Sequence, residues 1–182
     1  MSEYLAAQRY ARALSEAIAD SDQLDETLAW ITEFVALINS NAELRAALTS
    51  PSIRLAERTA VLDHVLKRSE ASPLLSSFLR EVLRRGRIQN LQEIARVFRR
   101  RVDERLKRTT AQVTTARPVS DEHADRLQEG LSTYTGKTVR IKRTVDPEII
   151  GGVVVKVDGT IIDGSLKARL QLLRDAIIAE EN

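Results

Sequence analysis

The hydrophobic period of this chain changes once, near Arg108, and that change limits the folds it can adopt. Before that point, apolar side chains recur three and four residues apart, which is the spacing of one face of an α-helix. After it, β-branched residues alternate with polar ones in short runs, as in half-buried strands. We therefore predict a mainly α chain, with an N-terminal six-helix bundle over residues 1–106 and a small α+β domain over residues 107–182.

The predicted helices of the bundle are separated by short polar or proline-containing breaks. The first carries two rows of small and apolar residues at helical spacing: Tyr4, Ala7, Ala11, Leu14 and Ile18, and beside them Ala6, Tyr10, Ala13 and Ala17. A helix that is apolar on more than one side is usually sandwiched between partners. Ser52 and Ser72 are expected to cap the fourth and fifth helices, and Gly86 to end the fifth. The sixth is expected from Ile88 to Lys107.

The second part predicts the order strand, helix, strand, strand, strand, helix. Asp158-Gly159 is typical of a tight hairpin turn between the last two strands. Ser165 is expected to cap a final helix that packs on the sheet through Leu166, Leu170 and Leu173. We interpret the following residues as architectural, because they stand where a turn, a positive φ or a helix cap is expected: Gly86, Gly151, Gly152, Gly159, Asp163 and Gly164.

Composition excludes several classes of chemistry. Because the chain has no cysteine, disulfides, thiolate metal sites and a thiol nucleophile are ruled out. It has only two histidines, His64 and His123, which are far apart in the sequence. Phosphate-binding loops, dinucleotide fingerprints and HExxH motifs are absent. We therefore predict no catalytic, cofactor-binding or metal-binding residues. A small enzyme stays open as an alternative that would need a polar pocket around His64.

Charge is distributed unevenly along the chain. Residues 51–108 hold fifteen Lys or Arg against seven Asp or Glu, whereas residues 1–50 hold three against eight. A basic helical face between Arg80 and Arg108 is compatible with a nucleic-acid-binding module, which remains the alternative function. The only aromatic residue in that stretch is Phe98, which belongs to the apolar stripe. The basic face is therefore expected to lack an aromatic side chain on which bases could stack. A basic face that meets an acidic protein partner is the preferred interpretation. We expect no nucleic acid among the partners.

Several motifs, taken in order, resemble one family. They are the RYARAL segment at residues 9–14, Arg85-Gly86-Arg87, the ARPVS loop at 116–120, Gly136-Lys137, the VDP-x-x-x-GG segment at 145–152, and IDGS at 162–165. Their order and spacing resemble the delta subunit of the bacterial F-type ATP synthase, the family of the mitochondrial oligomycin sensitivity-conferring protein. The resemblance implies a stator subunit without its own catalysis. It would lie at the cytoplasmic face of the bacterial membrane and touch the membrane only through partners.

The resemblance also implies two protein partners. The N-terminal segment of the α subunit would bind the bundle between the first and fifth helices, where the candidate contact residues are Ala6, Ala7, Tyr10, Ala11, Leu14, Leu75, Phe78, Leu79 and Val82. The other interpretation, that these side chains are simply buried in the bundle, stays open. The b subunit of the peripheral stalk would meet the C-terminal domain, with Leu172 and Ile178 as candidates because they lie off the stripe expected to face the sheet.

Overall fold

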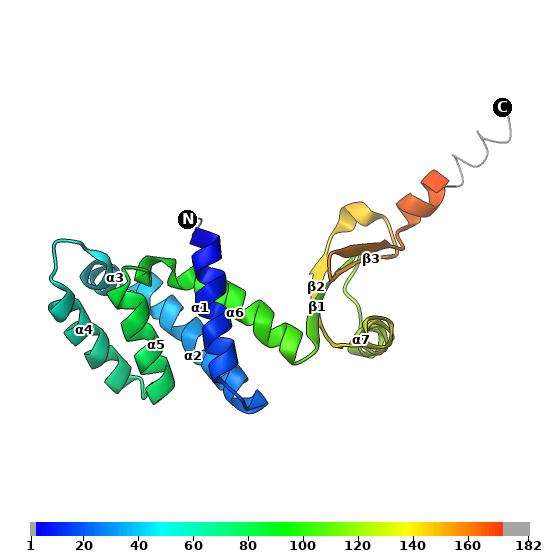
Figure 1. Ribbon diagram of the computed structural model, residues 1–182. Coiled ribbons are helices and arrows are strands. Elements are labelled where there is room, and N and C mark those ends of the chain that lie inside the picture. The colour runs from blue at the N-terminus through cyan, green and yellow to red at the C-terminus, as the bar shows by residue number, and fades with distance from the viewer. Residues whose placement is uncertain (1–2, 173–182) are drawn as a thin grey trace. The chain divides into compact units, whose positions relative to one another are not determined.

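The structure, a computed structural model, describes residues 3–172. The chain divides between Leu106 and Lys107 into two compact units, a helical one and a smaller one that contains a four-stranded sheet. Figure 1 shows the elements of both units. The predicted fold class, mainly α with a small α+β part at the C-terminal side, is confirmed.

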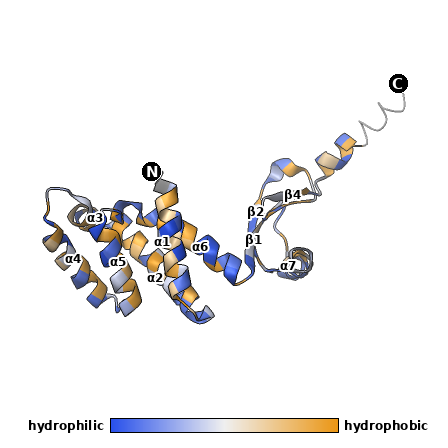
Figure 2. Ribbon diagram, viewed as in Figure 1, coloured by the Kyte–Doolittle hydropathy of each residue, from blue (hydrophilic) through white to orange (hydrophobic). Residues whose placement is uncertain are grey.

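The first unit consists of six α-helices around one core. They are α1 (Glu3–Ala17), α2 (Ser21–Ser40), α3 (Ala42–Thr49), α4 (Leu55–Arg68), α5 (Pro73–Arg84) and α6 (Leu91–Arg105), with the 3-10 turn η1 (Ile88–Asn90) before α6. The apolar side of each helix turns inward, as the hydropathy colours of Figure 2 indicate. α6 packs along both α1 and α2, so the last helix of the unit is also its centre.

Local signals explain most of the helix ends, and two expectations were wrong. Ser72 caps α5 by accepting from the Leu75 backbone N–H at 3.3 Å, as predicted. Ser52 does not cap α4, which begins at Leu55 after Arg54 and has no side-chain cap. The sixth helix is shorter than expected, because η1 precedes it and Lys107 leaves helical geometry with φ +48°.

The second unit is a two-layer α+β structure. Its sheet has the order β2-β1-β3-β4, from β1 (Arg108–Thr115), β2 (Thr138–Val145), β3 (Val153–Val157) and β4 (Thr160–Asp163). β1 and β2 are parallel and are connected by α7 (Asp121–Thr135), as a crossover between parallel strands requires. Alternate residues of β1 turn toward the α7 side and are buried, which leaves the opposite face polar.

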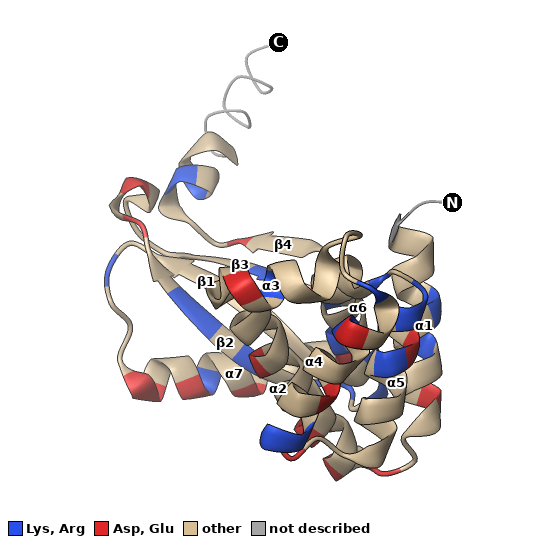
Figure 3. Ribbon diagram, turned by 90° about the vertical axis from the view of Figure 1, so that its left-hand side faces the viewer, with Lys and Arg blue, Asp and Glu red and all other residues tan. Residues whose placement is uncertain are grey.

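The two edges of this sheet differ in character. β2 carries Arg140, Lys142 and Arg143, and Figure 3 shows basic residues along it; such charges discourage pairing with another strand. β4 carries Ile161 and Ile162, both exposed.

The Asp158-Gly159 turn pairs Val157 with Thr160, as predicted. Hydrogen bonds from Lys137 at 2.8 Å and from Thr109 at 2.6 Å lower the pKa of the Asp158 carboxyl.

The final helix departs from the expectation that it packs on the sheet. Residues 166–172 are helical, but Leu166 and Leu170 are exposed. The helix is held at its beginning instead: Asp163 Oδ1 accepts from the Ser165 backbone N–H at 2.9 Å, and Ser165 Oγ accepts from that of Ala168 at 3.2 Å. The expected packing on the sheet is therefore wrong for Leu166 and Leu170, and Leu173 lies outside the described residues.

Candidate functional site

One recess of the bundle lies between α1 and α5 and is lined in part by the predicted residue Tyr10. Tyr10 and Phe78 form an edge-to-face pair, with ring centroids 6.3 Å apart and planes at 77°. Beside this pair is a hollow of about 520 Å³, which we call the α1–α5 hollow; it is lined by Arg9, Tyr10, Ala13, Glu81, Arg85 and Arg87. One aromatic ring, three guanidinium groups and one carboxylate thus surround it.

Electrostatics in the α1–α5 hollow are dominated by arginine. Arg85 Nε donates to Glu81 Oε1 at 2.8 Å, and Arg84 donates to the other oxygen of the same carboxylate. The hydrogen bond from Arg85 is the main reason that the pKa of Glu81 is lowered. Glu81 therefore stays ionised and offsets only part of the positive charge. A segment with an apolar side and a carboxylate has matching chemistry for this recess.

The candidate contact residues fall into two groups. Tyr10 and Phe78 are half-buried, so each presents part of its ring at the surface. The others are buried within the bundle: Ala6, Ala7, Ala11, Leu14, Leu75, Leu79 and Val82. These buried side chains help to hold α1 and α5 in place and offer little surface of their own. A contact with a partner remains a prediction for the whole set.

Sequence reasoning missed the polar lining of the hollow. Ala13 lies three residues after Tyr10 on α1, and Glu81 lies three residues after Phe78 on α5, so helical spacing from the two aromatics leads to both. The Arg85-Gly86-Arg87 sequence ends α5 at the same place. Helical spacing from Phe78 was therefore a signal that could have found Glu81, the one carboxylate of the lining.

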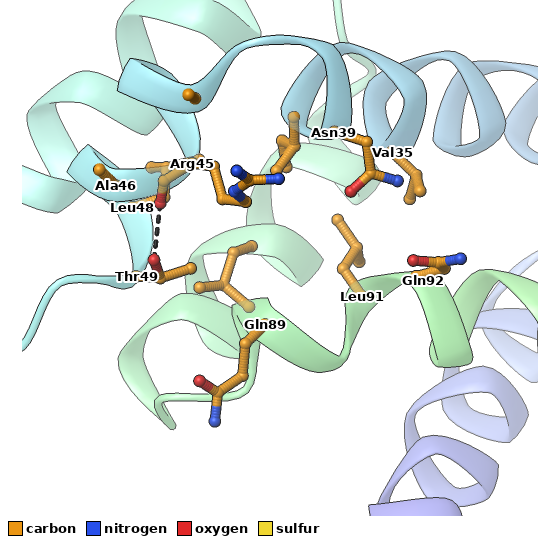
Figure 4. A pocket seen from close by; sticks show the side chains of 12 residues that line it. Val35, Asn39, Arg45, Ala46, Leu48, Thr49, Gln89, Leu91 and Gln92 are labelled. Carbon is orange, nitrogen blue, oxygen red and sulfur yellow. Dashed lines mark hydrogen bonds between the residues drawn. The ribbon is translucent and has the colours of Figure 1, made fainter.

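A second recess of about 440 Å³ lies between the α2–α3 corner and the η1–α6 corner (Figure 4). Ile38, Leu48 and Leu91 supply apolar lining, and Arg45 reaches across the recess from α3 in Figure 4. Amide side chains of Asn39, Gln89 and Gln92 complete it. Its lining contains neither a carboxylate nor a histidine, so its chemistry suits contact with an apolar group better than proton transfer.

Many arginines of the basic stretch from Arg80 to Arg108 are occupied by contacts within the bundle. Arg80 pairs with Asp63 at 2.7 Å, and Arg96 pairs with Glu93 at 2.7 Å. Arg100 lies over the Tyr4 ring, 5.9 Å from its centroid. Guanidinium groups that already make such contacts are less available to the phosphates of a nucleic acid. The basic stretch therefore offers fewer phosphate-binding groups than its composition suggests.

The surface of the second unit presents large apolar side chains near the start of its last helix. Ile150, Leu166, Leu170 and Leu172 are all exposed there. Leu172 is thus available to a partner, which is compatible with its predicted role, and Ile178 lies outside the described residues. The contact with the b subunit remains a prediction for both residues.

The architectural residues stand at positions with clear local demands. Gly86, Gly152 and Gly159 have positive φ. Gly151 makes a weaker demand: a methyl group there would lie 2.7 Å from Leu166 Cδ1, the end of a flexible and exposed side chain that can move aside. Gly164 passes close to the Val153 carbonyl, and Asp163 caps the turn that follows.

Within residues 3–172, no helix combines the length and the apolar character needed to cross a membrane. The same residues contain no group of three or more His, Cys, Asp or Glu arranged to hold a metal ion.

The structure thus comprises two units, and the recesses described above in the helical one are lined by apolar, aromatic, amide and arginine side chains. The family profile described as ATP synthase delta (OSCP) subunit matches residues 6–177. The ATP synthase subunit delta of Chlorobium luteolum is 36% identical over 181 residues, which cover 100% of this chain and 99% of that protein. That of Desulfitobacterium hafniense is 37% identical over 171 residues, or 94% and 95% of the two chains. The chain belongs to the ATP synthase delta (OSCP) subunit family.

A solved structure shares the fold. A chain of the mitochondrial ATP synthase hexamer of Toxoplasma gondii superposes with a TM-score of 0.59 at 20% sequence identity, covering 94% of this chain and 97% of that one. The match extends over both units, so the succession of helical bundle and small α+β unit is common to the two chains.

Proposed function

We propose that this chain is the peripheral-stalk subunit that links the catalytic sector of a rotary F-type ATP synthase to its membrane-anchored b subunit, without a catalytic site of its own. The observation that carries the proposal is the match to delta subunits along nearly the whole chain. The two compact units, each with apolar or aromatic side chains at its surface, support a role at two different contacts.

In this proposal, the helical bundle binds the catalytic sector through the α1–α5 hollow. The N-terminal segment of the α subunit binds there as an amphipathic helix in a groove. The edge-to-face pair of Tyr10 and Phe78 supplies apolar contact, and Arg9, Arg85 and Arg87 favour a segment that carries carboxylates. The buried members of the predicted set hold the two helices that form the walls.

The other end of the connector is the C-terminal unit, whose partner is the b subunit of the stalk. Leu172 and the neighbouring exposed leucines support a helix-on-helix contact there. The mechanism needs no chemistry: contacts at both ends hold the catalytic sector still while the rotor turns, so that proton flow drives synthesis instead of rotating the whole head. The subunit would lie at the cytoplasmic face of the bacterial membrane, reaching it only through its partners.

A matched pair of substitutions on α1 tests the bundle contact. Ala13 is exposed and lines the α1–α5 hollow, whereas Ala17 is exposed one turn further along the same helix and is not among its lining residues. Ala13→Trp should fill the recess and weaken binding of a synthetic α N-terminal peptide at least about tenfold by titration calorimetry. Ala17→Trp should bind like the wild type, with unchanged circular dichroism for both variants.

Equal peptide affinity of the two variants would move the α contact away from this hollow. The same would follow if the wild-type chain did not bind the peptide. In that case the recess lined by Arg45 would be tested next with the equivalent substitution Ala46→Trp.

The nucleic-acid alternative has no support from the comparisons, since the relatives named above are ATP synthase subunits. The ion pairs of Arg80 and Arg96 also remove guanidinium groups that phosphate binding would need.

A further inference from the structure

The loop between β2 and β3 holds an isoleucine in a conformation that isoleucine rarely adopts. Ile150 has φ +64° and ψ −46°, directly after the 3-10 turn η2 (Pro147–Ile149). The Gly151 backbone N–H donates to the Ile149 carbonyl at 2.7 Å, so Ile150 is the central residue of a γ-turn of the positive-φ kind. For a β-branched residue this geometry is a strained outlier.

Close backbone contacts hold the residues that directly follow Ile150. The Leu166 N–H donates to the Gly151 carbonyl at 2.9 Å, and the Gly164 N–H donates to the Val153 carbonyl at 2.9 Å. A methyl group on Gly152 would collide with the Gly164 carbonyl oxygen and lie 2.9 Å from Ser165 Cα. The loop is thus clamped to the start of the last helix, and the clamp leaves Ile150 pointing outward.

The strained side chain is also one of the most exposed large apolar groups of the described chain. Ile150 is 69% exposed, and the neighbouring Leu166 and Leu170 are 47% and 61% exposed. Burial within the fold therefore does not compensate for the strain. Residues that the surrounding structure holds in such strained conformations cluster at functional sites.

The charges around this surface indicate the kind of partner that fits it. Lys167 and Arg169 lie on the same helical stretch as the exposed leucines and form no ion pair within residues 3–172. An occupant that carries an apolar stripe flanked by carboxylates satisfies both the leucines and these two cations. An amphipathic helix with acidic flanks has that chemistry.

We infer that Ile150 is an anchor side chain, held outward by a strained γ-turn, for an acidic-flanked amphipathic helix that lies against Leu166 and Leu170. The inference rests on the proposed function, in which that helix is supplied by the b subunit of the stalk. It adds a specific contact, outside the last helix, that the proposed function does not itself require.

The inference predicts that stability and affinity change in opposite directions. Ile150→Gly, made in the full chain, relieves the positive φ and removes the anchor. For this variant, the melting temperature of the transition that corresponds to the α+β unit should rise by about 2–4 °C. Its affinity for a purified soluble segment of the b subunit, measured by titration calorimetry, should fall about tenfold or more. Ile150→Leu keeps an apolar side chain and should retain affinity within about threefold.

Tyr134→Ala is the matched control, because Tyr134 is 68% exposed in the same unit but lies on α7. It should leave the affinity unchanged. A lower melting temperature for Ile150→Gly, or an unchanged affinity with wild-type binding intact, would overturn the anchor role and leave the proposed function standing. Failure of the wild-type chain to bind the b segment would instead overturn the proposed stalk contact.

Discussion

The C-terminal ends of α4 and α5 have the same backbone geometry but differ in the residue that adopts the left-handed conformation. α5 ends with Gly86 at φ +65°, and the Arg87 N–H donates to the Val82 carbonyl at 2.9 Å. α4 ends in the same way, with Ala71 donating to Leu66 at 3.1 Å, but its left-handed residue is Glu70 at φ +51°. Both are Schellman motifs, and only one of them has the glycine that such a position favours.

We predict that Glu70→Gly stabilises the chain. The left-handed conformation costs an L-residue about 1–2 kcal/mol, and the extra flexibility of glycine in the unfolded state offsets about half of that gain. Glu70 is exposed and makes no side-chain hydrogen bond or ion pair in the described structure, so no such interaction is lost. The free energy of unfolding in urea should rise by about 0.5–1 kcal/mol.

The opposite substitution at the other helix serves as the control for this prediction. Gly86→Ala places a side chain at the same left-handed geometry and should lower the free energy of unfolding by about 1 kcal/mol. If Glu70→Gly were the destabilising variant, glycine preference would not govern the α4 end.

At the scale of elements, one arginine ties the end of α6 to the end of α1. Arg105 Nη1 donates to the carbonyls of Ser15 at 2.8 Å and Ile18 at 2.7 Å, and Nη2 donates to that of Ala19 at 2.9 Å. The last carbonyls of a helix have no partner within it, and α1 has no basic residue in its own last turn. The guanidinium therefore caps α1 from a helix that lies some 90 residues later in the chain.

We predict that Arg105→Met costs about 2 kcal/mol of unfolding free energy, because it removes a charged donor to three carbonyls. Arg105→Lys should recover only part of that loss, since an ammonium cannot reproduce the fork of a guanidinium. Arg99→Met is the matched control, because Arg99 makes one long hydrogen bond to Thr32 at 3.3 Å and should cost less than about 0.5 kcal/mol. Equal losses for Arg105→Met and Arg99→Met, measured in urea, would refute the capping role.

The whole molecule consists of two units with unequal cores. Twenty-one buried residues form the apolar cluster of the bundle, and six form that of the α+β unit, within the described part of the chain. Burial of apolar surface is the main stabilising term, so the smaller unit has much less of it. We therefore expect the α+β unit to be the less stable of the two.

We predict that the full chain unfolds in two steps, with the α+β unit first. Trp30 is the only tryptophan and lies in the bundle, stacked on Phe34 with ring centroids 4.9 Å apart. Its fluorescence should report a urea midpoint above that of the first transition seen by circular dichroism. Coincident midpoints for both probes would mean that the two units unfold as one.

Local sequence alone determined the elements of this protein. The six helices, the change of period at Arg108, the Asp158-Gly159 turn and the Ser72 cap depend on residues within about four positions of one another. Such neighbours meet in any fold that contains the element, which is why their spacing predicts it. The prediction for Ser52 was wrong because a capping residue must directly precede the first residue of its helix, and α4 begins at Leu55.

Only the tertiary structure decided which faces are covered. The two rows of α1 look alike in sequence, yet Ala7 and Ala11 are buried whereas Ala13 and Ala17 are exposed. The capping of α1 by Arg105 and the outward, strained Ile150 are likewise set by segments that are distant in the chain or clamped across a loop. The burial or strain of a residue depends on the segments of the chain that pack against it. The periodicity of a single segment carries no information about those other segments.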